Sequence, residues 1–128
     1  MVLGLLWSGN AYTNNLIGKK LECNFSDVMW QYFEFETEEK VQKWLYTKAR
    51  KPIKFSTYYY EAGTGFITIY PDKKKDILNR DGMLSRETLK YKEKVLTYEC
   101  KIINENIDEL LEKRFEIDSE KQKKKNKI

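Results

Sequence analysis

Two stretches of the chain alternate between apolar and polar residues, and each contains one cysteine. Residues 19–25 (KKLECNF) place Cys23 in phase with the apolar positions, and residues 95–103 (VLTYECKII) do the same for Cys100. A period of two is typical of a strand with one buried face, so both sulfurs are expected on the buried side. We therefore predict that a first and a last strand lie side by side and that the two cysteines join them.

Between these stretches, runs rich in aromatic and β-branched residues predict further short strands. They comprise residues 27–35, 41–47, 53–60, 66–70, 83–84 and 88–91. The run 41–47 (VQKWLYT) also fits one face of a helix, and we favour a strand because its neighbours are strands. The glycine-containing loop 61–65 and the pair Asp81-Gly82 indicate hairpin turns.

About eight short strands at a spacing of roughly 8–12 residues are typical of a barrel or a sandwich. Pairing of the first strand with the last would close the sheet on itself. We therefore predict an all-β domain over residues 14–103, an antiparallel up-and-down barrel of about eight strands, followed by a C-terminal helix.

The helix is expected over residues 104–117. Asn106 is a suitable N-terminal cap, and one apolar stripe at helical spacing consists of Ile107, Leu110, Leu111 and Phe115. Such a helix could close one end of the barrel, pack on its outside or bind a partner, and we favour packing on its own domain. Residues 118–128 are expected to form a disordered basic tail.

The net charge of the chain comes from its end. The formal charge is +4, and residues 119–128 hold five lysines and one glutamate, so the rest of the chain is neutral. A basic tail without aromatic residues is a weak indication of nucleic-acid binding, and no nucleic-acid partner is expected. No apolar run approaches the roughly 20 residues that a membrane-spanning helix needs.

Residues 1–13 combine a short apolar block, VLGLLW, with the small and polar residues that follow it. This composition is typical of the end of a secretory signal peptide, and an ordinary N-terminal strand or helical turn is the alternative. Export agrees with a pair of cysteines placed to form a disulfide, because oxidising compartments preserve such bonds. We expect a periplasmic or secreted protein.

Catalytic chemistry is poorly represented. The chain has no histidine, which removes the usual general base and the commonest metal ligand. It has no C-x-x-C motif, so a redox role for the cysteines is not expected, and two reduced cysteines in the core are the alternative to a disulfide. We therefore expect no metal site and no cofactor, and we expect that the protein is not an enzyme.

The aromatic residues are the remaining candidates for function. A small barrel fills its interior with side chains or holds a small ligand there. We expect five of the aromatic residues in the strands to line a ligand pocket, with core packing as the alternative: Trp30, Tyr32, Trp44, Tyr58 and Phe66.

The chain resembles the small lipocalin-like (calycin-type) proteins that Gram-negative bacteria export, and it is similar to uncharacterised alphaproteobacterial periplasmic proteins. The resemblance covers roughly residues 16–103. It is carried by Gly18–Cys23, Phe33-Glu34-Phe35 with Lys40-Val41, the tyrosine-rich hairpin, Leu84–Leu89 and Tyr98-Glu99-Cys100. The G-x-W motif of the first lipocalin strand is absent, because Lys19 and Lys20 follow Gly18.

Two hypotheses for function result. The resemblance implies a non-enzymatic periplasmic barrel that binds a small hydrophobic or amphipathic ligand. The alternative is a protein-binding module, such as a periplasmic inhibitor of a cell-wall hydrolase, since lysozyme inhibitors are also small disulfide-containing barrels. An internal cavity lined by aromatic residues would favour the first hypothesis. A filled interior with a protruding aromatic loop near Glu61–Gly65 would favour the second.

Overall fold

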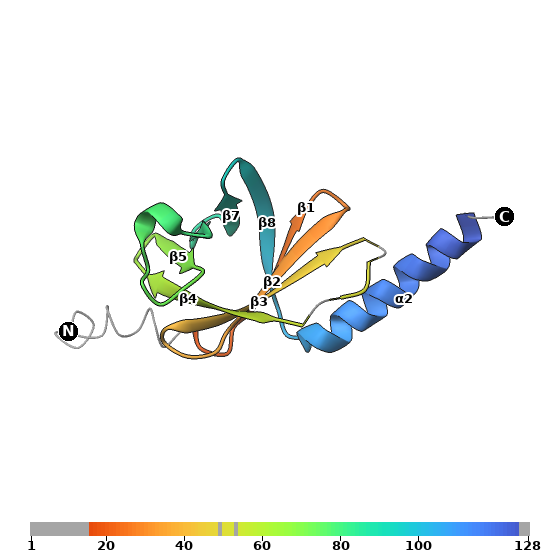
Figure 1. Cartoon of the computed structure of the whole chain (residues 1–128), viewed down its shortest axis with the longest axis horizontal. Helices are drawn as coiled ribbons and strands as arrows, with labels where there is room; N and C mark the ends of the chain where they lie inside the picture. The colour runs from red at the N-terminus through yellow and green to blue at the C-terminus, as the bar shows by residue number, and fades with distance from the viewer. Residues whose placement is uncertain (1–15, 49, 53, 126–128) are drawn as a thin grey trace.

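The computed structural model describes residues 16–48, 50–52 and 54–125, so the predicted signal segment 1–13 lies outside the described residues. Within them, eight antiparallel strands pair in chain order and form a closed barrel (Figure 1). The strands are β1 (Lys20–Phe25), β2 (Met29–Phe35), β3 (Lys40–Thr47), β4 (Ser56–Ala62), β5 (Phe66–Tyr70), β6 (Gly82–Ser85), β7 (Lys90–Glu93) and β8 (Leu96–Ile103). A 3₁₀ turn, η1 (Ile77–Asn79), precedes β6, and the helix α2 (Ile107–Lys125) follows β8. The predicted up-and-down barrel is confirmed.

The barrel closes where β1 pairs with β8. In that pairing Cys23 lies directly opposite Cys100, and a disulfide joins the two residues. Cys23 is completely buried, as its phase in the alternation predicted. The predicted link between the first and last strands is therefore confirmed.

The interior of the barrel is filled by side chains. Phe33, Tyr60, Tyr91 and Tyr98 all point inward and are almost fully buried. The ring of Tyr91 contacts those of Phe33 and Tyr98, with centroids 5.0 Å and 6.4 Å apart, and the ring of Tyr60 contacts that of Phe35 at 4.8 Å. Burial raises the pKa of Tyr60 to about 12, and its hydroxyl donates to the carbonyl oxygen of Thr37. Aromatic packing thus occupies the space that a ligand would need.

Part of the outer face of β2 and β3 is also apolar, and α2, which projects from the barrel (Figure 1), packs against it. Ile107 and Leu111 of the helix pack in one buried cluster with aromatic residues of the two strands: Trp30, Tyr32, Trp44 and Tyr46. The indole of Trp44 donates to Asp108 at 2.9 Å. Two strands that bury both faces explain why the run 41–47 also matched a helical pattern.

Charged groups join α2 to the barrel beside this cluster. Arg114 lies 3.2 Å from the carboxylate of Glu22 on β1, and its guanidinium lies 4.6 Å from the centre of the Trp30 ring. The same carboxylate accepts a hydrogen bond from the hydroxyl of Tyr32 at 2.8 Å. The helix therefore packs on its own barrel, as we expected, and it does so on the outer face.

The helix is longer than the sequence indicated. The Asn106 cap is confirmed, since its side-chain oxygen accepts a hydrogen bond from the backbone of Glu109 at 3.0 Å. The helix continues to Lys125, through most of the segment 118–128 that we expected to be disordered. One reason is local: Asp118 accepts a hydrogen bond from the hydroxyl of Tyr46 at 2.6 Å, which ties a later turn to β3. The other is that lysines near a helix C-terminus interact favourably with its dipole.

The predicted Asp81-Gly82 turn is wrong. Residues 71–81, including η1, connect β5 to β6, and Gly82 is the first residue of β6, opposite Ile69. Glycine is needed there for close approach rather than for a turn. A Cβ atom at this position would lie 2.5 Å from the ring of Tyr91 and 2.6 Å from the carbonyl oxygen of Lys92.

Removing the disulfide tests how far the barrel depends on its closure. The bond spans a sequence separation of 77 residues. In the chain-entropy model a loop of that size stabilises the folded state by about 4.5 kcal/mol. We expect the free energy of unfolding of the double variant Cys23→Ala/Cys100→Ala to be lower than that of the wild type by most of this amount. Urea denaturation, followed by tryptophan fluorescence, measures the difference. Wild-type protein in reductant is the control and should lose a similar amount. A loss below about 1 kcal/mol in both would contradict a stabilising closure.

Candidate functional site

The five aromatic residues that we expected to line one pocket lie in three places. Trp30, Tyr32 and Trp44 are on the outer face of the barrel, buried beneath α2. Tyr58 packs against the interior cluster, and the ammonium of Lys43 lies 4.8 Å from the centre of its ring. Phe66 is 52% exposed on the outer wall. The structure does not bring the five together, and ligand binding stays a prediction.

A buried ionic cluster occupies the interior, and we call it the lysine cluster: Lys43, Asp81, Glu93, Tyr91 and Gln31. Lys43 is only 5% exposed, and its ammonium lies 2.8 Å from one oxygen of Asp81, 3.0 Å from the other and 3.2 Å from Glu93. Burial by itself lowers the pKa of Lys43, but the two carboxylates outweigh it and the pKa is raised above its usual value. Lys43 therefore remains charged inside the barrel.

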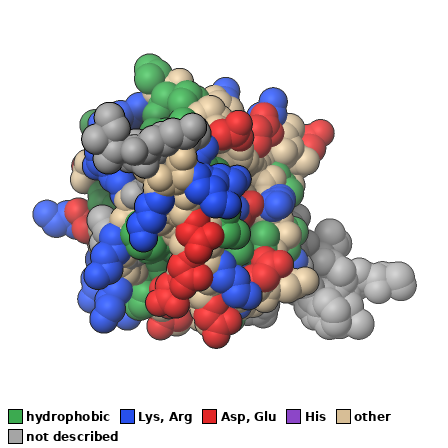
Figure 2. Space-filling view, turned by 90° about the vertical axis from the view of Figure 1, so that its right-hand side faces the viewer, with side chains coloured by type: hydrophobic (Ala, Val, Ile, Leu, Met, Phe, Trp, Pro, Cys, Tyr) green, Lys and Arg blue, Asp and Glu red, His purple; other side chains and the backbone are tan. Residues whose placement is uncertain are grey.

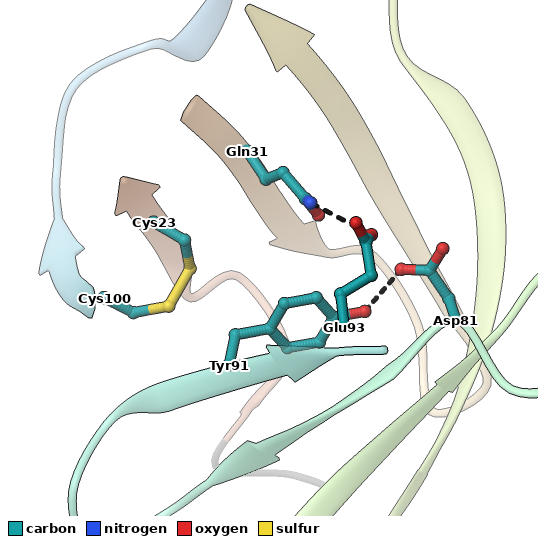
Figure 3. The surroundings of a disulfide bond; sticks show 6 residues. All are labelled: Cys23, Gln31, Asp81, Tyr91, Glu93 and Cys100. Atoms are coloured by element: carbon teal, nitrogen blue, oxygen red, sulfur yellow. Dashed lines mark hydrogen bonds between the residues drawn. A yellow bond between two sulfur atoms is a disulfide. The ribbon is translucent and has the colours of Figure 1, made fainter. Parts of the chain in front are cut away.

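Tyr91 and Gln31 complete the lysine cluster (Figure 3). The hydroxyl of Tyr91 donates to Asp81, and the amide of Gln31 donates to Glu93 at 3.0 Å. Burial, together with the neighbouring Asp81 carboxylate, raises the pKa of Tyr91 far above its usual value, so the hydroxyl stays a neutral donor. Every charged group of the cluster has a partner, which suits a structural tie between strands better than a reactive group.

The sequence pattern contains one signal for this cluster. In the run 41–47, Lys43 falls on the same phase as Val41, and Val41 is completely buried. A charged side chain at an inward position of a strand needs a buried counter-charge. The counter-charges are Asp81 and Glu93, from segments far along the chain, and the sequence did not identify them.

An open hollow lies on the outer wall formed by β5, β6 and β7. It has a volume of about 800 Å³, and we call it the β5–β7 groove. Its apolar lining includes Phe66, Leu78 and Met83, and its basic lining consists of Arg80, Lys90, Lys92 and Lys94. Leu78 is 91% exposed, which is unusual for so large an apolar side chain. In the strand order, β6 lies across the barrel from β2 and hence from α2.

Asp81 belongs to both the groove and the lysine cluster. It lines the β5–β7 groove, while its carboxylate is bound from the interior by Lys43 and Tyr91. Its negative charge is therefore largely neutralised from within. The groove combines apolar side chains with a surplus of positive charge.

A second open groove, of about 750 Å³, runs between α2 and the segment that precedes β4. Phe55 and Phe115 line it together with Lys51, Lys54, Glu112 and Glu116, so both signs of charge are present. The side of the molecule from which α2 projects likewise shows basic and acidic side chains interspersed (Figure 2). This groove carries no comparable surplus of one sign.

Within residues 16–48, 50–52 and 54–125, no group of three or more His, Cys, Asp or Glu side chains is placed to hold a metal ion. None of the helices described there is long and apolar enough to cross a membrane.

No protein-family model, no curated protein and no solved structure matches this chain. The closed barrel of eight antiparallel strands with a C-terminal helix is consistent with the lipocalin-like architecture that the resemblance implied.

Replacing Lys43 tests the structural role of the lysine cluster. The variant Lys43→Met leaves two carboxylates without their cation, and we expect the free energy of unfolding to fall by about 3 kcal/mol at neutral pH. The deficit should shrink as the solution is made acidic, because protonation removes the uncompensated charge of the variant. Urea denaturation at several pH values measures both effects.

The matched control is Lys101→Met. Lys101 pairs with Glu22 at 3.3 Å, but its side chain is 71% exposed. An exposed ion pair contributes at most about 1 kcal/mol, so this variant should stay close to the wild type. Equal losses in the two variants, or a Lys43→Met deficit that does not change with pH, would show that the cluster is not an ionic tie.

Proposed function

We propose that this protein is a non-enzymatic binding protein that holds a small amphipathic ligand in the β5–β7 groove, outside the barrel rather than within it. The observation that carries the proposal is the hollow on the outer wall, because Phe33, Tyr60, Tyr91 and Tyr98 are almost fully buried and pack the middle of the barrel. The groove volume of about 800 Å³ falls in the range of roughly 300–1,000 Å³ typical of small-molecule sites. Exposed apolar side chains beside charged ones suit an amphipathic ligand.

An exported location supports this function and belongs to the same proposal. The disulfide between Cys23 and Cys100 is of the kind that oxidising compartments preserve. Together with the resemblance to exported lipocalin-like proteins, it favours the periplasm or the extracellular space.

The second candidate is a protein-binding module, and the filled interior also favours it. The loop at Glu61–Gly65 contains no aromatic residue, although Phe66 follows it and is half exposed. A stable protein interface generally buries about 800 Å² on each partner and has a broad apolar centre. The exposed apolar side chains of the β5–β7 groove instead surround one hollow, so we favour a small ligand.

A neutral fluorescent probe tests the proposal. N-phenyl-1-naphthylamine is apolar and uncharged, so its binding reports the apolar part of a site. We expect Phe66→Ala to raise its Kd about tenfold, because loss of a partly buried aromatic contact costs about 1.4 kcal/mol. Fluorescence titration of the purified full chain gives the Kd.

Phe55→Ala is the matched control, since Phe55 is 41% exposed and lines the groove beside α2. It should change the Kd of the probe less than twofold. If Phe55→Ala weakened binding and Phe66→Ala did not, the site would be the groove beside α2. If the full chain bound no probe but retained a protein through purification, the protein-binding module would be the better account.

A further inference from the structure

We propose that the ligand of the β5–β7 groove is an anionic single-chain amphiphile, free in solution. Its alkyl chain lies on Phe66, Leu78 and Met83, and its headgroup is held by the lysines of β7 and by Lys94, which follows β7. This inference rests on the proposed function and adds the chemical class of the ligand.

The register of the outer wall separates an apolar zone from a basic one. Along one outward row, Thr68 of β5 pairs with Met83 of β6, and Met83 pairs with Lys92 of β7. Phe66 lies two residues before Thr68, on the same face of β5. The wall therefore changes from apolar on β5 and β6 to cationic on β7, and a ligand across it would need one apolar end and one anionic end.

The positive charge of the basic zone is not balanced within the groove. Its lining has four cationic side chains, Arg80, Lys90, Lys92 and Lys94, against one carboxylate, that of Asp81. Asp81 already binds Lys43 and Tyr91. Lys90 lies 3.7 Å from Glu99, but both side chains are largely exposed, so this pair is weak. Lys92 and Lys94 have no ion-pair partner among the described residues.

This local surplus contrasts with the rest of the domain. The chain outside residues 119–128 has no net charge, and the side from which α2 projects shows both signs interspersed (Figure 2). A concentration of one sign of charge in a hollow attracts the opposite sign more strongly than a mixed surface does. The apolar zone beside it favours a ligand with an alkyl chain over a simple anion. Leu78 and Phe66 are 91% and 52% exposed, and contact with an alkyl chain would remove that surface from water.

Competition against the neutral probe tests the headgroup. Laurate, below the concentration at which it forms micelles, should displace N-phenyl-1-naphthylamine from the full chain, and dodecyltrimethylammonium of the same chain length should not. The laurate Kd should rise with salt, because the lysines are exposed. Equal displacement by the two amphiphiles would overturn the assignment of an anionic headgroup.

The variant Lys92→Gln/Lys94→Gln locates the headgroup. We expect it to raise the laurate Kd about tenfold and to leave the Kd of the neutral probe within twofold. The matched control Lys101→Gln/Lys113→Gln removes the same charge from β8 and α2, and it should leave both constants within twofold. Equal laurate affinity in the two double variants would overturn the proposal.

Two further outcomes separate this inference from the function on which it rests. If the neutral probe binds through Phe66 but laurate does not displace it, the groove is a binding site and the anionic ligand is wrong. If the protein sediments with vesicles of anionic lipid while monomeric laurate does not bind, the surface is a membrane contact and the inference fails. If the neutral probe does not depend on Phe66, the proposed function itself fails.

Discussion

Closure of the sheet between β1 and β8 is the constraint on which the rest of the structure depends. The disulfide places Cys23 and Cys100 opposite each other at that closure, so the first and last strands are held in one register. Once the register is set, the alternation of side chains along each strand decides which residues face the interior. An open sheet with the same strands would leave two edges unpaired.

A barrel of this size has little room inside, and here aromatic rings and an ionic cluster take it up. The ring of Tyr91 crosses over Gly82, where no Cβ atom would fit, and so reaches Asp81. Asp81 in turn binds Lys43 from β3. The interior therefore ties together strands that are not neighbours in the sheet.

The outer wall is divided between structure and candidate function. Part of the outer face of β2 and β3 is apolar and packs against α2, which adds a second buried cluster around Trp30 and Trp44. On β5 to β7 the outer wall remains exposed, with Phe66 and Leu78 beside a row of lysines. The difference has a simple physical origin: a helix can cover only part of a cylinder, and the part across the barrel from it keeps its contact with solvent.

The sequence by itself determined the strands, the helix start and the inward phase of both cysteines, because a period of two, a capping Asn106 and a helical stripe are local signals. It did not determine which face of β2 and β3 was the interior, since both faces carry large apolar residues and the pattern has no phase that distinguishes them. Trp30, Tyr32 and Trp44 were therefore expected in a pocket and lie beneath α2. The sequence also did not identify the partners of Lys43. Nor did it show that Lys92 and Lys94 line one groove with Phe66, because the chain outside residues 119–128 has no net charge. Those arrangements depend on which strands are neighbours and on how the barrel closes, and only the tertiary structure decided them.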